Sequence, residues 1–171
     1  MIKNQIFLHS IINSRSREKI SSSIVRGLGI PDAVEFLSSK FQIDITDDVN
    51  IVQEYERDSS NLHGKADALC RPANEKECAL TLAYCYEAKI PITVSAGRTN
   101  LNGGATPVGG LVLSMEKMTQ PTLKVDLNSK TVTAPVGIFL EDMRQEILMQ
   151  SSKKLHYPVD PTSRKEAMVG G

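Results

Sequence analysis

Apolar residues recur at helical spacing through the first part of the chain, once before Gly29 and again after Pro31. This spacing predicts two helices within residues 1–54, because apolar side chains three or four positions apart share one helix face. Gly29 suits the end of the first helix, and Pro31 suits the first turn of the second. We therefore expect a helical N-terminal extension, residues 1–54, that packs on another part of the protein.

The pattern changes near Tyr55. A short apolar run predicts a strand over residues 66–70, and residues 73–89 have the spacing of a helix. Asn74 can cap that helix, with Glu77 placed three positions later as its capping-box partner. The β-branched run at residues 90–96 predicts a second strand, so this part of the chain is expected to be a β-α-β unit.

Three more elements follow a Gly-rich stretch. Residues 110–115 predict a strand, residues 123–137 a β-hairpin that turns at 128–130, and residues 138–154 an amphipathic helix. The expected fold class is α+β, with the helical extension followed by a second part that covers residues 55–171.

Composition narrows the functional classes. Lys plus Arg and Asp plus Glu number 20 each, so the formal net charge is zero and gives no basic surface for nucleic acid. No apolar run predicts a membrane span or a signal peptide, and an odd number of cysteines favours a reducing compartment. We expect a cytoplasmic protein whose Cys70, Cys78 and Cys85 fill the core. The three histidines are scattered, so no metal site is predicted.

The stretch SAGRTNLNGGATPVGG, residues 95–110, places five glycines between two predicted strands. Glycine lets backbone N–H groups approach a ligand closely, and successive N–H groups bind anions such as phosphate. The stretch matches neither GxGxxG nor GxxxxGK[ST]. Its composition alone fits a phosphate-binding loop and a long hairpin connection equally well. Upstream, Asp58 suits a helix cap or turn, or support of this site.

The order of three segments, residues 90–118, 125–147 and 156–171, carries a resemblance. It resembles the FAD-binding domain of the vanillyl-alcohol oxidase and p-cresol methylhydroxylase type. The group that it is most similar to holds FAD-linked D-lactate dehydrogenases, glycolate oxidase subunits and 2-hydroxyglutarate dehydrogenases. The resemblance runs from about Tyr55 to Gly171. It implies FAD bound between two α+β subdomains, of which this chain holds the first and the start of the second.

Residue by residue, the resemblance implies three groups of FAD contacts. The loop around the pyrophosphate corresponds to Ser95, Ala96, Gly97, Arg98, Thr99, Asn100, Leu101 and Gly103. The element near the flavin ring and ribityl chain corresponds to Pro158, Asp160, Pro161, Thr162 and Ser163, and a second Gly-rich turn begins at Gly170 and Gly171.

Two features of the loop affect its expected backbone conformation and its expected mode of FAD binding. Ala96 and Arg98 stand where the family often has glycine, which strains the backbone wherever φ is positive. The loop has no histidine for covalent flavin attachment, so FAD is expected to bind non-covalently.

The resemblance implies a flavin-dependent oxidoreductase that takes a hydride from the α-carbon of a 2-hydroxy acid such as lactate or glycolate. No catalytic residue is assigned, because the substrate-binding part of the family is not in this sequence. Two alternatives remain. One is a non-catalytic truncated remnant or interaction subunit, which a separate chain could complete. The other is a nucleotide or phosphate binder of unrelated fold.

Overall fold

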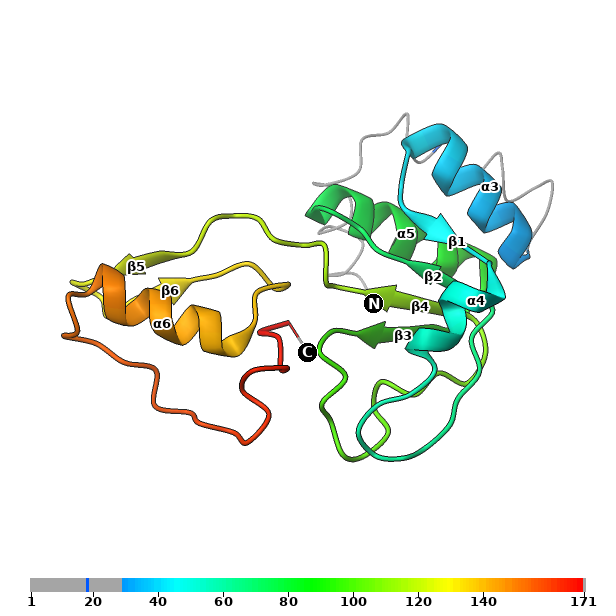
Figure 1. Cartoon of the computed structure of the whole chain (residues 1–171). Helices are drawn as coiled ribbons and strands as arrows, with labels where there is room; N and C mark the ends of the chain where they lie inside the picture. Colours follow the sequence, from blue (N-terminus) through cyan, green and yellow to red (C-terminus); the bar gives the residue numbers. More distant parts are fainter. Residues whose placement is uncertain (1–17, 19–28, 171) are drawn as a thin grey trace.

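The computed structural model describes residues 18 and 29–170, which form a larger and a smaller lobe (Figure 1). The expected helix before Gly29 falls almost wholly outside these residues. The helices are α3 (Ile30–Phe41), α4 (Val49–Val52), α5 (Glu75–Ala88) and α6 (Leu140–Gln150), with a 3-10 turn η1 (Gln53–Tyr55). The strands are β1 (Ile45–Thr46), β2 (Ala68–Cys70), β3 (Ile92–Ser95), β4 (Leu111–Ser114), β5 (Lys124–Asp126) and β6 (Thr131–Thr133).

The larger lobe is built on a four-stranded sheet of order β1-β2-β4-β3. Strands β2 and β3 both run parallel to β4, which lies between them, and β1 pairs with β2 in the antiparallel sense. All four residues of β4 are buried. Parallel strands covered on both faces are continuous apolar runs, which is why the LVLS sequence of β4 does not alternate with polar residues.

Side chains of the central strands alternate between two clusters. Leu111 and Leu113 face the core that α3 and α5 cover, and Figure 1 shows both helices on one side of the sheet. Val112 points to the other face, where it packs with Val52 and Tyr55. This period of two follows from the pleat of a strand, and Tyr55 packs on the face of the sheet opposite to α3 and α5.

Residues 30–52 are part of this lobe. Leu37 is fully buried, and the rings of Phe36 and Tyr84 lie 5.5 Å apart between α3 and α5. The purely helical character expected for residues 1–54 does not hold at β1, where Ile45 pairs with Cys70. A two-residue strand has no periodicity to detect, since its partner supplies the order. The proposed division between residues 54 and 55 stays a prediction.

The cap of α5 confirms the expected signal. The Asn74 side chain accepts a hydrogen bond from the Glu77 backbone N–H at 3.0 Å, and the Glu77 carboxylate accepts from the Ala73 N–H at 2.8 Å. We expect Asn74→Ala to lower the free energy of unfolding by about 1 kcal/mol, because a helix N–H loses its acceptor. Asn74→Ser retains an acceptor and should lose clearly less. Urea unfolding of the two variants measures the difference, and equal losses would contradict the capping role.

The smaller lobe confirms the hairpin and the last helix. Strands β5 and β6 pair around the turn, and α6 packs on them through Leu123, Met143 and Ile147. Helix α6 ends earlier than the sequence indicated, since Ser152 and Lys153 both take positive φ values. The last described residues then return between the lobes (Figure 1), where the N–H of Gly170 donates to the Val136 carbonyl at 2.8 Å.

Candidate functional site

The Gly-rich loop, residues 96–110, leaves the carboxyl end of β3 and returns to the start of β4. Because β3 and β4 run parallel, this loop is a crossover between neighbouring strands. The alternative of a long hairpin connection is therefore wrong, since a hairpin joins antiparallel strands. The carboxyl ends of parallel strands are where open α/β sheets bind ligands.

A cavity of about 380 Å³ lies between this loop and the segment that precedes Gly170. Its lining residues are Val94, Ala96, Gly97, Arg98, Thr99, Asn100, Asn102, Gly104, Ala105, Ala167 and Met168. The loop forms one wall and Ala167–Met168 the other. The two walls approach closely at Gly97, where an added Cβ would lie 2.3 Å from the carbonyl oxygen of Glu166.

The backbone N–H groups of residues 97–101 find no acceptor within the part of the chain that the structure describes. Among the residues that the structure describes, none of these five groups donates a hydrogen bond. Residues 97–100 are partly exposed and Leu101 is 79% exposed, so water can reach these N–H groups and a ligand at the loop can replace it. Successive free N–H groups are suited to an anion.

Arg98 takes φ of +53°, whereas Ala96 has no positive φ. Only Arg98 is therefore strained by standing in a glycine position, at about 1–2 kcal/mol for a left-handed residue. Contacts of its backbone and of its side chain hold it. Its carbonyl oxygen accepts from the Ser59 N–H at 3.1 Å, and its guanidinium carbon lies 4.6 Å from the centre of the Tyr55 ring. The Tyr55 hydroxyl donates to Glu116 at 2.7 Å, which ties the loop to the end of β4.

Asp58 supports the loop from behind. Its Oδ2 accepts from the Asn100 side-chain amide at 2.6 Å and from the Ala105 N–H at 3.2 Å, while Oδ1 accepts from the Ser60 N–H at 2.9 Å. The hydrogen bond from the Ser60 side chain and the other donors lower the pKa of Asp58 to about 2. Asp58 thus makes a local turn and also contacts the Gly-rich loop, and its support of a ligand site stays a prediction.

Comparison with known proteins identifies the fold family. The family model described as FAD binding domain matches residues 66–171. The chain belongs to this family. The expected α+β flavin-domain fold is confirmed as well, since the chain superposes on alkyldihydroxyacetonephosphate synthase with a TM-score of 0.70 at 19% identity, over 83% of this chain and 28% of that one. The 6-hydroxy-D-nicotine oxidase of Arthrobacter nicotinovorans superposes at 0.53 with 20% identity, over 71% of this chain and 24% of that one.

Curated relatives of this FAD-binding family are more similar in sequence. Glycolate oxidase subunit GlcD of Bacillus subtilis is 39% identical over 106 residues, which are 61% of this chain and 22% of GlcD. A D-lactate dehydrogenase of Anaerostipes hadrus is 35% identical over 130 residues, 74% of this chain and 26% of that enzyme. The chain thus spans about a quarter of the length of the relatives it matches.

Only some of the expected FAD contacts line the cavity. Ala96, Gly97, Arg98, Thr99 and Asn100 line the cavity. Three others of the loop do not line it: Ser95, which is 1% exposed, Leu101, which is 79% exposed, and Gly103, whose φ is +78°. These remain predictions as cofactor contacts.

The Pro-Asp-Pro element lies beside α6. Asp160 accepts hydrogen bonds from Arg144 and Arg164, each at 2.7 Å, so its carboxylate holds this segment against the helix. None of Pro158, Asp160, Thr162 and Ser163 lines the cavity. Gly170 lies against Val136, and Gly171 falls outside the described residues.

Several residues that line the cavity were not predicted from the sequence. Val94, Asn102, Gly104, Ala105, Ala167 and Met168 line the cavity but were not among the expected FAD contacts. Ala167 and Met168 reach it only through tertiary packing, so their residue types give no signal. Their nearness to the second Gly-rich turn of the family was the one available hint.

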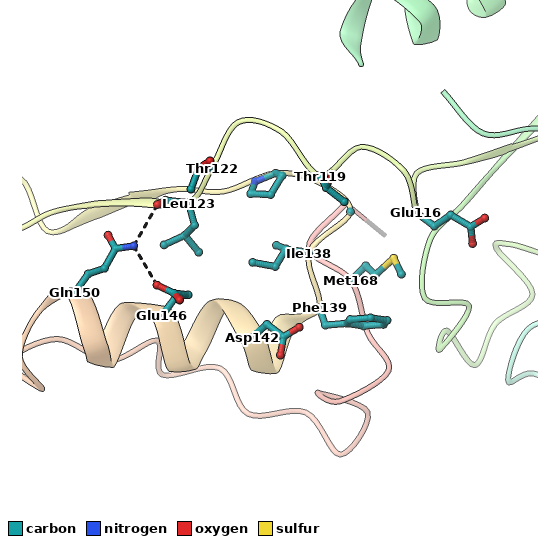
Figure 2. A pocket seen from close by; sticks show the side chains of 12 residues that line it. Glu116, Thr119, Thr122, Leu123, Ile138, Phe139, Asp142, Glu146, Gln150 and Met168 are labelled. Carbon is teal, nitrogen blue, oxygen red and sulfur yellow. Dashed lines mark hydrogen bonds between the residues drawn. The ribbon is translucent and has the colours of Figure 1, made fainter. Parts of the chain in front are cut away.

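A second cavity of about 530 Å³ lies along α6 and the segment that links the lobes, and it shares Met168 with the first (Figure 2). Its walls include Leu123, Ile138 and Phe139, and its charged residues are all acidic: Glu116, Asp142 and Glu146. A lining with carboxylates and no base repels phosphate. An anion is therefore better placed at the Gly-rich loop.

The cysteines are poorly suited to act as nucleophiles. All three are unpaired, and burial raises the pKa of Cys70 and of Cys85 to about 12. These thiols stay protonated at neutral pH, so they are poor nucleophiles. Within residues 29–170 no group of three or more His, Cys, Asp or Glu side chains is placed to hold a metal ion. The described helices include none that is long and apolar enough to cross a membrane.

Proposed function

We propose that the Gly-rich loop binds the pyrophosphate of FAD non-covalently, in the FAD-binding part of an oxidoreductase that acts on a 2-hydroxy acid such as lactate or glycolate. The run of free N–H groups at residues 97–101 carries this proposal. Arg98 adds the only charged side chain among the lining residues, and its charge is opposite to that of the pyrophosphate. No histidine occurs among residues 95–110, which supports non-covalent binding.

FAD, once bound, supplies a flavin ring that accepts the hydride of the substrate. The residues of this chain bind and orient it. The N–H groups of the loop hold the anion, Asn100 and Arg98 border it, and Ala167 with Met168 close the cavity against water on the opposite side. The 2-hydroxy acid is inferred from the names of the glycolate oxidase subunit and the D-lactate dehydrogenase.

The groups that bind substrate lie in this proposal outside residues 1–171, on the same polypeptide or on a separate chain that completes the flavin domain. A separate chain would make this protein a subunit without activity of its own. The three unpaired thiols support a cytoplasmic location, where the environment is reducing.

The proposal is tested by titrating the purified chain with FAD and following flavin fluorescence. We expect saturable binding that ADP displaces, because ADP carries the same pyrophosphate, and that adenosine does not displace. Absence of saturation up to about 1 mM FAD, which corresponds to about −4 kcal/mol, would refute the cofactor site. Binding of ADP that FAD does not displace would instead support a nucleotide binder of another kind.

A further inference from the structure

We propose that Asp58 is a positioning residue, whose carboxylate holds the Gly-rich loop in the conformation that presents the N–H groups of residues 97–101. This inference rests on the function proposed above, since it concerns how the same site is kept in shape. Asp58 does not line the cavity, so its effect on a ligand acts through the loop.

The contacts of Asp58 and of its neighbour Ser59 lie within the free N–H run and shortly after it. Its Oδ2 binds Asn100, near the end of the run, and Ala105, just beyond it. The next residue, Ser59, contacts the beginning of the run, because its N–H and its hydroxyl both donate to the carbonyl of Arg98, at 3.1 and 3.2 Å. Asp58 and Ser59 together bind the loop at Arg98, Asn100 and Ala105, three residues that line the cavity.

The Asn100 side chain depends on this arrangement. Its amide nitrogen faces Asp58 Oδ2 at 2.6 Å and Asn102 Oδ1 at 3.4 Å, and both partners are acceptors. The amide orientation is therefore fixed by its neighbours, with the NH₂ group directed to the protein. Without the carboxylate at position 58, Asn100 has no strong partner to set its orientation beside the cavity.

The chemistry requires a carboxylate at position 58. Oδ1 accepts from the N–H and the hydroxyl of Ser60, and Oδ2 accepts from Asn100 and Ala105, so both oxygens face donors. An ionised carboxylate is an acceptor at both oxygens, whereas an asparagine amide has one acceptor and one donor group. In Asp58→Asn, the NH₂ group must face the N–H of Ser60 or that of Ala105 whichever way it turns.

Two effects of this substitution on FAD binding have opposite signs. Removing a negative charge near an anion site favours binding, because like charges repel. Opening the loop weakens binding, because the ligand must then order the N–H groups itself. A fall in affinity therefore reports the positioning role, and a simple charge effect would give a rise.

The test compares Asp58→Asn with the matched control Asp126→Asn. In the β5–β6 turn, the one oxygen Oδ1 of Asp126 accepts from the N–H groups of Asn128 and Ser129, which an asparagine oxygen can also do. We expect the FAD dissociation constant to rise about tenfold or more in Asp58→Asn and to change less than twofold in Asp126→Asn. Measurement well below the unfolding temperature keeps both variants folded, so a loss of stability alone would leave the constant unchanged.

Amide hydrogen exchange of the chain without FAD separates this inference from the proposed function. We expect the Ala105 amide, which donates to Asp58, to exchange about tenfold faster in Asp58→Asn and at the original rate in Asp126→Asn. Unchanged Ala105 exchange, or unchanged FAD affinity in a chain that binds FAD, would overturn the positioning role. Failure of the unaltered chain to bind FAD, with Ala105 exchange accelerated as expected, would overturn the proposed function and retain the role of Asp58 in the loop.

Discussion

Gly97→Val is expected to abolish measurable FAD binding, with a rise in the dissociation constant of about a hundredfold or more. At Gly97 the loop touches the opposite wall of the cavity, and an added Cβ would lie 2.3 Å from the Glu166 oxygen and 3.0 Å from the Ala167 Cα. Those neighbours are backbone atoms, which cannot rotate away as a side chain can. A valine must therefore separate the two walls or twist the loop, and either change moves the N–H groups away from an anion.

Hydrogen bonds hold the segment at Ala167, which forms the opposite wall of the cavity, in place. The Ala167 carbonyl accepts from the N–H of Leu140 at 2.8 Å, and the Ala167 N–H donates to the Ser163 carbonyl at 2.7 Å. The segment is therefore fixed to the start of α6. A hundredfold change corresponds to about 2.7 kcal/mol, which is within the usual size of an overpacking penalty.

Flavin fluorescence titration measures the effect of Gly97→Val, with Gly104→Ala as the comparison within the same loop. At Gly104 an added Cβ meets only the side-chain tips of Asn102 and Asn100, at 3.3 and 3.4 Å. These tips can shift by a few tenths of an ångström, so the comparison variant should lose less than tenfold in affinity. FAD binding by Gly97→Val within threefold of the unaltered chain would show that the cavity at residues 96–105 is not the pyrophosphate site. A melting curve confirms that the variant is folded.

Local signals explain which elements were predictable. Helix α5 carries its cap in sequence, since Asn74 and Glu77 are three positions apart, and the β5–β6 hairpin has its turn between two short alternating runs. Strand β1 was not predictable, because its two residues become a strand only by pairing with Cys70 and Leu69. The parallel sense of β3 and β4 is also a tertiary property, and it is what rules out a hairpin at the Gly-rich loop.

The residues of the site can also be divided into those that the sequence predicts and those that only the fold brings together. The glycines and the family resemblance pointed to residues 95–101 and 103, of which residues 96–100 line the cavity. The resemblance gave Ala167 and Met168 no role, although they form the opposite wall, because only packing against Gly97 brings them there. Asp58 was left between two interpretations for a related reason. Sequence shows a carboxylate near a turn, but only the fold shows that four donors surround it.

Gly110→Ala is expected to lower the free energy of unfolding by about 3–4 kcal/mol, a large part of the stability of a domain of this size. Gly110 has φ of +75°, and an added Cβ would lie 2.2 Å from the carbonyl oxygen of Pro91. That oxygen accepts the first hydrogen bond between β3 and β4, from the N–H of Leu111 at 2.9 Å. The carbonyl of Gly110 in turn accepts from Asp67 at 2.8 Å, so a displacement here loosens β4 from both neighbours.

Gly109→Ala is the matched control, because Gly109 and Gly110 both have positive φ but differ in the free space around an added Cβ. Gly109 has φ of +77°, but the nearest atom to an added Cβ is a carboxylate oxygen of Asp67 at 3.7 Å. Its substitution should therefore show only the strain of a left-handed alanine, about 1–2 kcal/mol. Urea unfolding at neutral pH gives both values, and the difference between them isolates the collision with Pro91. Equal losses in the two variants would mean that β3 and β4 can separate at this point without penalty. In that case the return of the Gly-rich loop into β4 would not depend on the close contact between Gly110 and Pro91.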